Sequence, residues 1–212
     1  MKLKWWGHAA FQITSEDGLK ILTDPYDDQV GYKPIVEEVD LVTVSHDHFD
    51  HNAVDILPGN PEVFRKTGTF DYKGIKIKGV KSYHDKAGGQ ERGENIIFTV
   101  EVDGFRVCHL GDLGHLPDEA LIKQIGDIDI LLTPVGGTFT IDHEEAYQTT
   151  RILNPSIIVP MHFKTEVLTF DISGVERFTD HFPPEQVQVI GDSEINIKKL
   201  PDKQVICVLD YH

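Results

Sequence analysis

Long apolar runs, cysteines and a leader-like start are scarce or missing in this chain. No apolar run reaches the roughly 18 residues that a membrane-spanning helix needs, which argues against such a helix. Only Cys108 and Cys207 occur, both in apolar stretches and neither near a second cysteine, so we expect reduced core residues and no cysteine metal site. The first residues lack the apolar stretch and small-residue cleavage site of a signal peptide, and we therefore expect a cytoplasmic protein.

Basic residues are few relative to acidic ones. The chain has 20 lysines and arginines against 35 aspartates and glutamates, which gives a formal net charge of −15. This surface is a poor match for a phosphate backbone, so we expect no nucleic-acid partner, and the lack of an amphipathic anchor argues against a membrane partner. With 212 residues, 40% of them hydrophobic, we expect a single compact domain over residues 1–212.

Four metal-binding side chains occupy six positions directly after an apolar run. Residues 41–44 are Leu-Val-Thr-Val, and His46, His48, Asp50 and His51 follow them. Residues two apart in a strand-end loop can point the same way, so His46 and His48 can converge on one cation, while Asp50 and His51, where we expect a helix to begin, can bind a second. Without metal these groups would repel one another when protonated and would lose solvation when buried. The motif therefore indicates a metallohydrolase.

This motif resembles the signature of the metallo-β-lactamase superfamily. The pattern His-x-His-x-Asp-His over residues 46–51 is the most specific part of the resemblance. The opening Trp-Gly-His-Ala of residues 6–9 resembles the branch that contains ascorbate-6-phosphate lactonase and N-acylphosphatidylethanolamine phospholipase D. The resemblance implies an α+β fold, a four-layer αββα sandwich of two mixed β-sheets.

Three later residues follow the same family pattern in the same order. His84 comes after a strand-like run where the family has its third histidine ligand, Asp112 in Gly111-Asp112 matches the family's bridging aspartate, and His162 matches its last ligand. Two departures accompany them. Leu113 stands where the family usually has a threonine, which puts a hydrogen bond beside the bridge in doubt, and Asp85 adds a negative charge next to His84.

The resemblance implies two divalent ions held by seven residues. The expected ligands are His46, His48 and His84 for one ion, Asp50, His51 and His162 for the other, and Asp112 as a bridge between them. Two divalent ions outweigh two aspartates and a bridging hydroxide, so the centre stays positive and favours an anionic transition state. Zinc is the expected metal, with manganese, iron or nickel as alternatives, because imidazole and carboxylate suit all four.

The expected reaction is hydrolysis by a metal-bound hydroxide. A bound divalent ion can lower the pKa of water to about 7, so a bridging water would ionise near neutral pH and attack a carbonyl or phosphoryl centre. Asp50 and Asp112 are the expected catalytic residues, Asp50 also as a proton acceptor. We predict a small, anionic ester, lactone or phosphodiester as substrate. The alternative is a protein of the same fold that binds metal for sensing or structure without catalysis.

Several further residues are weaker candidates. His8 can contact substrate or orient a ligand, and a structural role is equally open. Phe139 lies in a loop that can shape the pocket, and Lys164 can pair with an anionic substrate group or remain solvated. Asp24 can hydrogen-bond a ligand histidine or simply form an Asp-Pro turn. The remaining histidines are expected to be structural or exposed, with two of them nearest the site: His115 and His143.

Apolar periodicity predicts mostly strands in the first half of the chain and mixed elements after it. Strands are expected at residues 3–6, 11–14, 19–23, 41–44, 75–82, 95–102 and 105–110, with Asp103-Gly104 as a hairpin turn. Later strands are expected at 128–133, 156–159, 187–190, 195–197 and 205–209. Helices are expected at residues 117–125, with Pro117 in the first turn, at 142–153, capped by Asp142 with Glu145 three residues on, and near 174–181.

Overall fold

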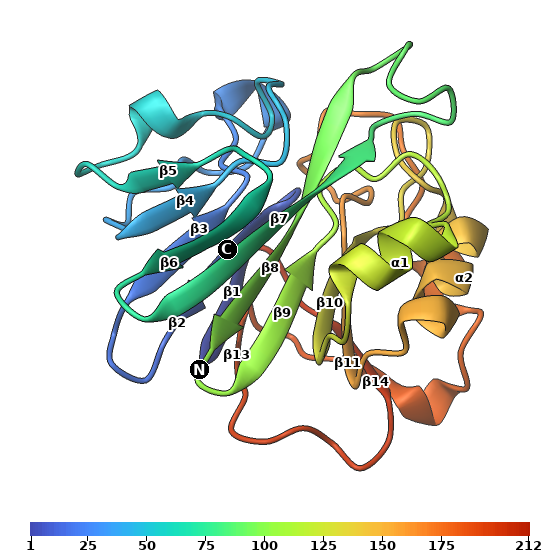
Figure 1. The fold of residues 1–212 in the computed structure, drawn as a ribbon. Helices are drawn as coiled ribbons and strands as arrows, with labels where there is room; N and C mark the ends of the chain where they lie inside the picture. The colour runs from blue at the N-terminus through green and yellow to red at the C-terminus, as the bar shows by residue number, and fades with distance from the viewer.

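The computed structural model describes residues 1–212 and contains two β-sheets packed face to face (Figure 1). The first sheet has six strands, in the order β13, β1, β2, β3, β4, β5, and the second has eight, in the order β12, β14, β11, β10, β9, β8, β7, β6. The first-sheet strands are β1 (Lys2–Gly7), β2 (Ala10–Thr14), β3 (Lys20–Thr23), β4 (Leu41–Thr43), β5 (Glu62–Phe64) and β13 (Glu194–Asn196). The second-sheet strands are β6 (Gly68–Tyr72), β7 (Ile75–Tyr83), β8 (Glu94–Val102), β9 (Phe105–His109), β10 (Ile130–Pro134), β11 (Ile157–Met161), β12 (Val187–Val189) and β14 (Val205–Val208).

Both sheets are mixed, as the sequence predicted. In the first sheet, β1 and β3 run the same way because each pairs antiparallel with β2, and β4 is parallel to β3. In the second, β9, β10 and β11 are parallel, and β7 runs with β9 because both pair antiparallel with β8. Strands that run the same way end at the same edge of a sheet, where ligand sites commonly form. The loops after these strands therefore share one rim.

Side-chain alternation in the first sheet fills a core on each of its faces. Leu3 and Trp5 of β1 belong to the larger cluster of 41 buried residues, which joins the two sheets. Trp6 and, on β3, Leu22 point the other way and belong to a second cluster of 13. Successive strand residues face opposite sides of a sheet, so apolar residues in both phases require a cover on both faces. This second cluster holds the rim loops of the first sheet against its outer face.

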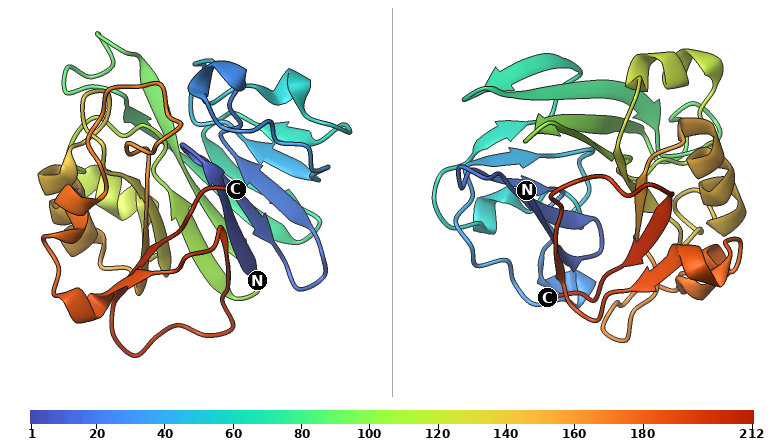
Figure 2. Two further views of the ribbon diagram at one scale, coloured as in Figure 1. Left: turned by 180° about the vertical axis from the view of Figure 1, so that it is seen from behind. Right: turned by 90° about the horizontal axis from the view of Figure 1, so that it is seen from below.

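The outer layers of the two sheets differ. The helices α1 (Glu119–Ile125) and α2 (His143–Leu153) lie on the outer face of the eight-stranded sheet, away from the six-stranded one (Figure 2). The six-stranded sheet is covered by loops and the short 3₁₀ helices η1 (Asp28–Val30) and η2 (Val54–Ile56). The remaining helices are α3 (Glu176–Thr179) and η3 (Pro184–Gln186). None of the helices has the length and apolar character needed to span a bilayer.

The helix predictions succeed where a local cap decides them. α2 has the predicted capping box, in which the Asp142 side chain accepts the Glu145 N–H. α1 begins later than predicted, at Glu119 rather than Pro117, because the Asp118 side chain caps it by accepting the Leu121 N–H. The predicted helix near residues 174–181 is reduced to the four residues of α3.

The helix expected to begin at Asp50 and His51 is absent. The chain turns there instead, with the N–H groups of His51 and Asn52 both donating to the His48 carbonyl. Only the three residues of η2 follow. The metal-binding motif therefore lies wholly in a rim loop.

Candidate metal centre

Every predicted ligand lies in a loop that follows a strand at the shared rim. The loops after β1, β3 and β4 supply His8, Asp24 and residues 46–51, and those after β7, β9 and β11 supply His84, Asp112 and His162. His8, Asp24 and His162 have positive φ angles of 50°, 37° and 50°. Such backbone is unfavourable for residues other than glycine and is concentrated at functional sites, where the surrounding structure enforces it.

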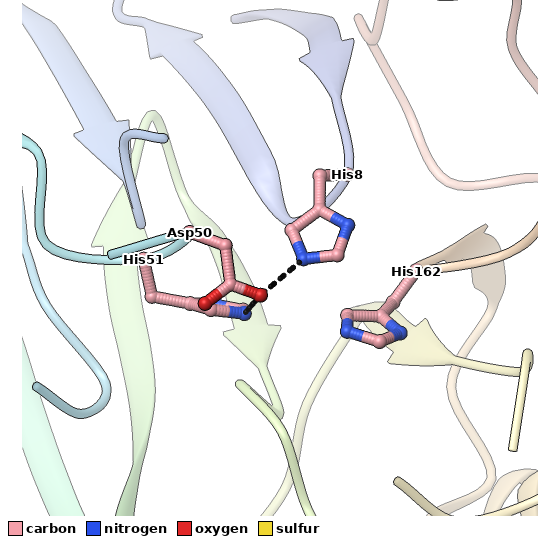
Figure 3. A group of neighbouring side chains, drawn as sticks. All are labelled: His8, Asp50, His51 and His162. Carbon is pink, nitrogen blue, oxygen red and sulfur yellow. Dashed lines mark hydrogen bonds and ion pairs between the residues drawn. The ribbon is translucent and has the colours of Figure 1, made fainter. Parts of the chain in front are cut away.

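The donor atoms form two neighbouring groups, which a third set, Asp24 with His46 and His51, connects. The nitrogen atoms of His46, His48 and His84 lie within 4.8 Å of one another. The second group meets the same distance limit and contains four residues: His8, Asp50, His51 and His162 (Figure 3). Imidazole nitrogens and carboxylate oxygens at such spacing are suitable ligands for a divalent cation. The division follows the one expected from the sequence, with His8 as an additional member of the second group.

Asp112 lies between the two groups. Its Oδ2 is 3.2 Å from Nε2 of His84 and 3.3 Å from Nε2 of His162, and its Oδ1 is 3.3 Å from Nε2 of His51. Nε2 of His46 lies 4.0 Å from Oδ2. One carboxylate therefore faces histidines of both groups, which is the position that a bridging ligand requires.

The buried donor atoms fit a metal ion. Nε2 of His46, Nε2 of His51 and Oδ1 of Asp112 are buried and have no hydrogen-bond partner. A buried polar atom without a partner raises the free energy of the folded state, so most such atoms in proteins are satisfied. Cations bound by the two groups would satisfy all three atoms.

Protonation in the site also suits metal binding. Burial lowers the pKa of His46 to about 3 and lowers that of His84, so both rings are neutral. Burial acts to lower the pKa of His51 too, but the carboxylates around it, Asp112 first, raise that pKa well above its usual value. Burial acts to raise the pKa of Asp112, but His162 and His51 hold it well below its usual range. Ionised carboxylates that attract a proton to His51 would attract a cation in its place.

A single buried carboxylate, Asp24, orients one histidine of each group. Its Oδ2 accepts hydrogen bonds from Nδ1 of His51 at 2.9 Å and from Oγ of Ser45 at 2.5 Å. Oγ of Ser45 lies 2.9 Å from Nδ1 of His46, and because its proton goes to Asp24 it accepts from that nitrogen. Nε2 of each ring is thus left to face the site. The prediction that Asp24 hydrogen-bonds a histidine of the motif is confirmed.

The backbone at Asp112 is fixed by Asn95, a residue that the sequence did not single out. Oδ1 of Asn95 accepts the Asp112 N–H at 3.0 Å, and its Nδ2 donates to Oγ of Ser82 at 2.7 Å and to the Leu110 carbonyl at 2.9 Å. Gly111 makes room for this contact, since a Cβ there would lie 2.3 Å from Oδ1 of Asn95. Asn95 thus supports the aspartate in a chain that has Leu113 in place of the usual threonine.

The weaker candidates from the sequence lie in different settings. His8 is buried, with its Nε2 3.1 Å from Oδ2 of Asp50. Lys164, expected to pair with a substrate anion, instead donates to the carbonyls of Leu168 and Phe170 at 2.6 and 2.7 Å, and so braces its own loop. Asp85, expected to add charge to the pocket, accepts backbone N–H groups of the loop that follows it.

His115 and His143 lie outside both donor groups. Nδ1 of His115 is 2.9 Å from the Leu116 carbonyl, and Nδ1 of His143 is 3.0 Å from Nε2 of His181. Both rings therefore have partners of their own away from the centre.

A cavity of about 420 Å³ opens above the two groups. Its floor is made of the donor residues His48, Asp50, His84, Asp112 and His162. Its walls are made of Phe49, Glu91, Arg92, Phe139 and Phe170, of which the sequence singled out only Phe139. A cavity of this size holds a small molecule, with three aromatic rings and two charged side chains around it and donor residues beneath.

Proteins of similar sequence are named metal-dependent hydrolases. Residues 2–162 match the family described as beta-lactamase superfamily domain. A UPF0173 metal-dependent hydrolase of Thermococcus onnurineus is 31% identical over 193 residues, which cover 78% of this chain and 85% of that protein. Another, from Thermoplasma acidophilum, is 28% identical over an alignment that covers 84% of this chain and 89% of that protein.

A solved structure extends the similarity to the whole chain. The crystal structure at 2.00 Å of a Thermotoga maritima protein, described as a candidate Zn-dependent hydrolase of the metallo-beta-lactamase superfamily, matches with a TM-score of 0.84. The two sequences are 37% identical, and the match covers 100% of this chain and 99% of that one. A metallo hydrolase of Ignicoccus hospitalis, at 24% identity, has the same fold with a TM-score of 0.66 over 85% of this chain and 89% of that one. The chain therefore belongs to the UPF0173 family of metal-dependent hydrolases, within the metallo-β-lactamase superfamily.

Proposed function

We propose that the protein is a dinuclear hydrolase of a small, anionic ester, lactone or phosphodiester. The observation that carries the proposal is the position of Asp112, whose two oxygens face histidines of both donor groups at 3.2 to 3.3 Å on the floor of the cavity. Zinc is the metal we propose first, followed by manganese, iron and nickel, since the donor set suits each. We further propose that the protein belongs to the branch of ascorbate-6-phosphate lactonase and N-acylphosphatidylethanolamine phospholipase D. The proposal is supported by the resemblance of the Trp-Gly-His-Ala motif, whose His8 lies beside Asp50.

Seven residues would hold the two ions. They are His46, His48 and His84 for one ion, Asp50, His51 and His162 for the other, and Asp112 for both. Divalent ions held there would lower the pKa of a bound water to about 7 and offset the negative charge that develops on the substrate. The chain itself supplies the rigid geometry, since Asp24 and Asn95 fix the ligands from behind.

We propose that Asp50 accepts the proton of the attacking water. Its Oδ2 already accepts a hydrogen bond from His8, because burial lowers the pKa of His8 to about 4 and a neutral ring beside a carboxylate must carry its proton on Nε2. During hydrolysis the water oxygen bonds to the carbonyl carbon or the phosphorus, and the bond to the leaving oxygen breaks. The proton passes from the water to Asp50 and then to that leaving oxygen.

Turnover and metal content, measured on the same samples, test the proposal. The purified protein is loaded with zinc, manganese, iron or nickel, and its metal content is measured by elemental analysis. It is then assayed with a carboxylic ester, a lactone and a phosphodiester, each in an anionic and a neutral form. We expect about two ions per chain and turnover of at least one anionic substrate. Fewer than one ion per chain contradicts the dinuclear centre, and two ions without turnover favour the non-catalytic alternative.

A further inference from the structure

Arg92 lines the cavity above the donor groups and has no carboxylate partner. Its guanidinium carbon lies 5.7 Å from the centroid of the Phe139 ring, the one contact its side chain makes with a charged or aromatic group. No other lysine or arginine lines this cavity. Arg92 therefore presents a free, planar set of donors to whatever enters, and guanidinium groups bind carboxylate and phosphate through paired hydrogen bonds.

The loop that carries Arg92 is held in place by Asp85. The Asp85 carboxylate accepts the N–H of Arg92 itself at 2.8 Å. It accepts three more from the same loop, those of Ala87, Gly89 and Glu91, at 2.8 to 3.0 Å. At the end of the loop, the Gly93 carbonyl accepts the N–H of His84 at 3.1 Å. A loop fixed at both ends and in its middle positions Arg92 before a ligand arrives, which reduces the entropy lost on binding.

Three phenylalanines from separate loops form the apolar wall of the same cavity. The Phe170 ring lies 6.2 Å from that of Phe49 and 6.0 Å from that of Phe139, so it joins the other two. Phe49 and Phe139 remain 48% and 37% exposed, although both lie beside Phe170 and line the same cavity. Gathered exposed aromatic rings beside a polar floor are typical of a ligand site.

We propose that this cavity binds an anion with an apolar body, whose carboxylate or phosphate pairs with Arg92 and whose apolar part packs on Phe49, Phe139 and Phe170. The binding mode stands on its own, and only the identification of this ligand as the substrate rests on the proposed function. Glu91 lines the same cavity, so its charge opposes that of Arg92. Replacing the Glu91 carboxylate with an amide should therefore strengthen anion binding, the opposite of what removing Arg92 does.

Binding of matched probes to the zinc-loaded protein tests this site. Phenylbutyrate and phenylbutyl phosphate carry the two candidate anionic groups, phenylbutanol lacks the charge, and butyrate lacks the ring. Affinities are measured by calorimetry. We expect Arg92→Ala to weaken both charged aromatic probes about tenfold or more, as for a hydrogen-bonded charge pair, and to leave phenylbutanol unchanged. Phe170→Leu should weaken all three aromatic probes and leave butyrate unchanged. The charged probe that loses more affinity in Arg92→Ala carries the anionic group, carboxylate or phosphate, that pairs better with Arg92.

Two control variants show whether a loss of affinity comes from Arg92 itself and from its paired donors. Arg65→Ala removes an exposed arginine that lines a neighbouring cavity but not this one, and it should change no affinity. Arg92→Lys keeps the charge without the paired donors and should give an intermediate loss. The proposal is overturned if Arg92→Ala leaves the charged probes unaffected, as expected when zinc alone holds the anion, or if it weakens phenylbutanol equally. Because the measurement needs no turnover, it remains decisive even if every candidate substrate in the activity assay fails.

Discussion

Nε2 of His8 lies 3.1 Å from Oδ2 of Asp50, and both side chains are buried. The bond joins the loop after β1 to the motif loop after β4, two segments that meet only at the rim. The His8 ring also lies 4.2 Å from the ring of His162, another member of the second donor group. His8 thus orients an aspartate that the sequence motif alone leaves without support.

We expect His8→Ala to weaken metal binding by the second donor group and to spare the first. Removal of a hydrogen bond to a metal ligand typically lowers metal affinity by about 10- to 100-fold. His8→Gln, which keeps an N–H donor on a side chain of comparable reach, should recover part of the loss. Zinc titration against a competing chelator measures both affinities. Equal loss from both groups would show that His8 acts only by maintaining the fold.

Asp112→Ala should abolish turnover and reduce the number of bound ions while leaving the fold intact. The substitution removes the carboxylate whose two oxygens lie beside histidines of both groups, yet it lies in a loop after β9, outside the packed strands. Asp202→Ala, at an exposed aspartate outside both donor groups, is the control and should retain both properties. Elemental analysis, turnover and circular dichroism give the three readouts. Unchanged turnover in Asp112→Ala would refute the bridging role.

His84→Ala and His162→Ala should each weaken a different ion. His84 belongs to the first donor group and His162 to the second, and both lie beside Asp112. Each variant therefore leaves the other group complete. Each variant should lower the affinity for its ion by at least the roughly 10- to 100-fold that is typical when only a residue hydrogen-bonded to a ligand is lost. His115→Ala and His143→Ala serve as controls because both rings have partners elsewhere. Loss of an ion from either control, with both ions kept in His84→Ala or His162→Ala, would mean that the ligands are assigned wrongly.

Glu37 should stabilise the protein above about pH 4.5 and lose that effect in acid. Partial burial acts to raise its pKa, but hydrogen bonds from Lys20 and Gln12, with Lys4 nearby, lower that pKa to about 2 from a usual value of 4.5. A carboxyl whose pKa is depressed by folding stabilises the folded state above the unfolded pKa, and the stabilisation disappears as the pH falls towards the folded one. Because the side chain is 34% exposed, we expect only about 1 kcal/mol after solvent screening.

Urea unfolding of the wild type and Glu37→Gln, at about pH 6 and again at about pH 2, checks this expectation. The variant should be less stable at the higher pH, and the two free energies of unfolding should converge at the lower one. Glu38→Gln changes the neighbouring, exposed carboxyl and is the matched control. A constant difference at both pH values would mean that the Glu37 charge does not stabilise the fold.

The two strands that the sequence did not predict, β5 and β6, contain no buried residue. β5 and β6 lie at the open edges of their sheets, and their residues are exposed or only half-buried. The edge strands β12 and β13 are no more buried, yet both were predicted, because apolar residues recur at every second position, Val187 and Val189 in one and Ile195 and Ile197 at the other. The central strands, by contrast, carry apolar runs because both faces of their sheets are covered. Among the helices, α2 was predictable because its capping box is visible in the sequence. The four-residue α3 has no side-chain cap to indicate it.

The donor residues were predictable because their chemistry is concentrated in a short motif and in the order of later histidines. Arg92 and Phe170 were not, since neither belongs to a motif and only the folding of separate loops brings them to one cavity. The role predicted for Asp85, a negative charge added to the pocket, was wrong. Its charge is used by four backbone N–H groups of the loop that positions Arg92, so it shapes the cavity without lying on its wall. Asn95 lies within a strand, where a polar residue gives no indication of its partner.

Because Asp24 holds His51 directly and His46 through Ser45, one buried carboxylate supports a histidine of each proposed metal position. The two positions would therefore share a support behind their ligands as well as a carboxylate between them. Loss of the Asp24 charge should weaken both positions together, whereas His8→Ala should weaken only one. A zinc titration of Asp24→Asn should accordingly show a lower affinity for both ions.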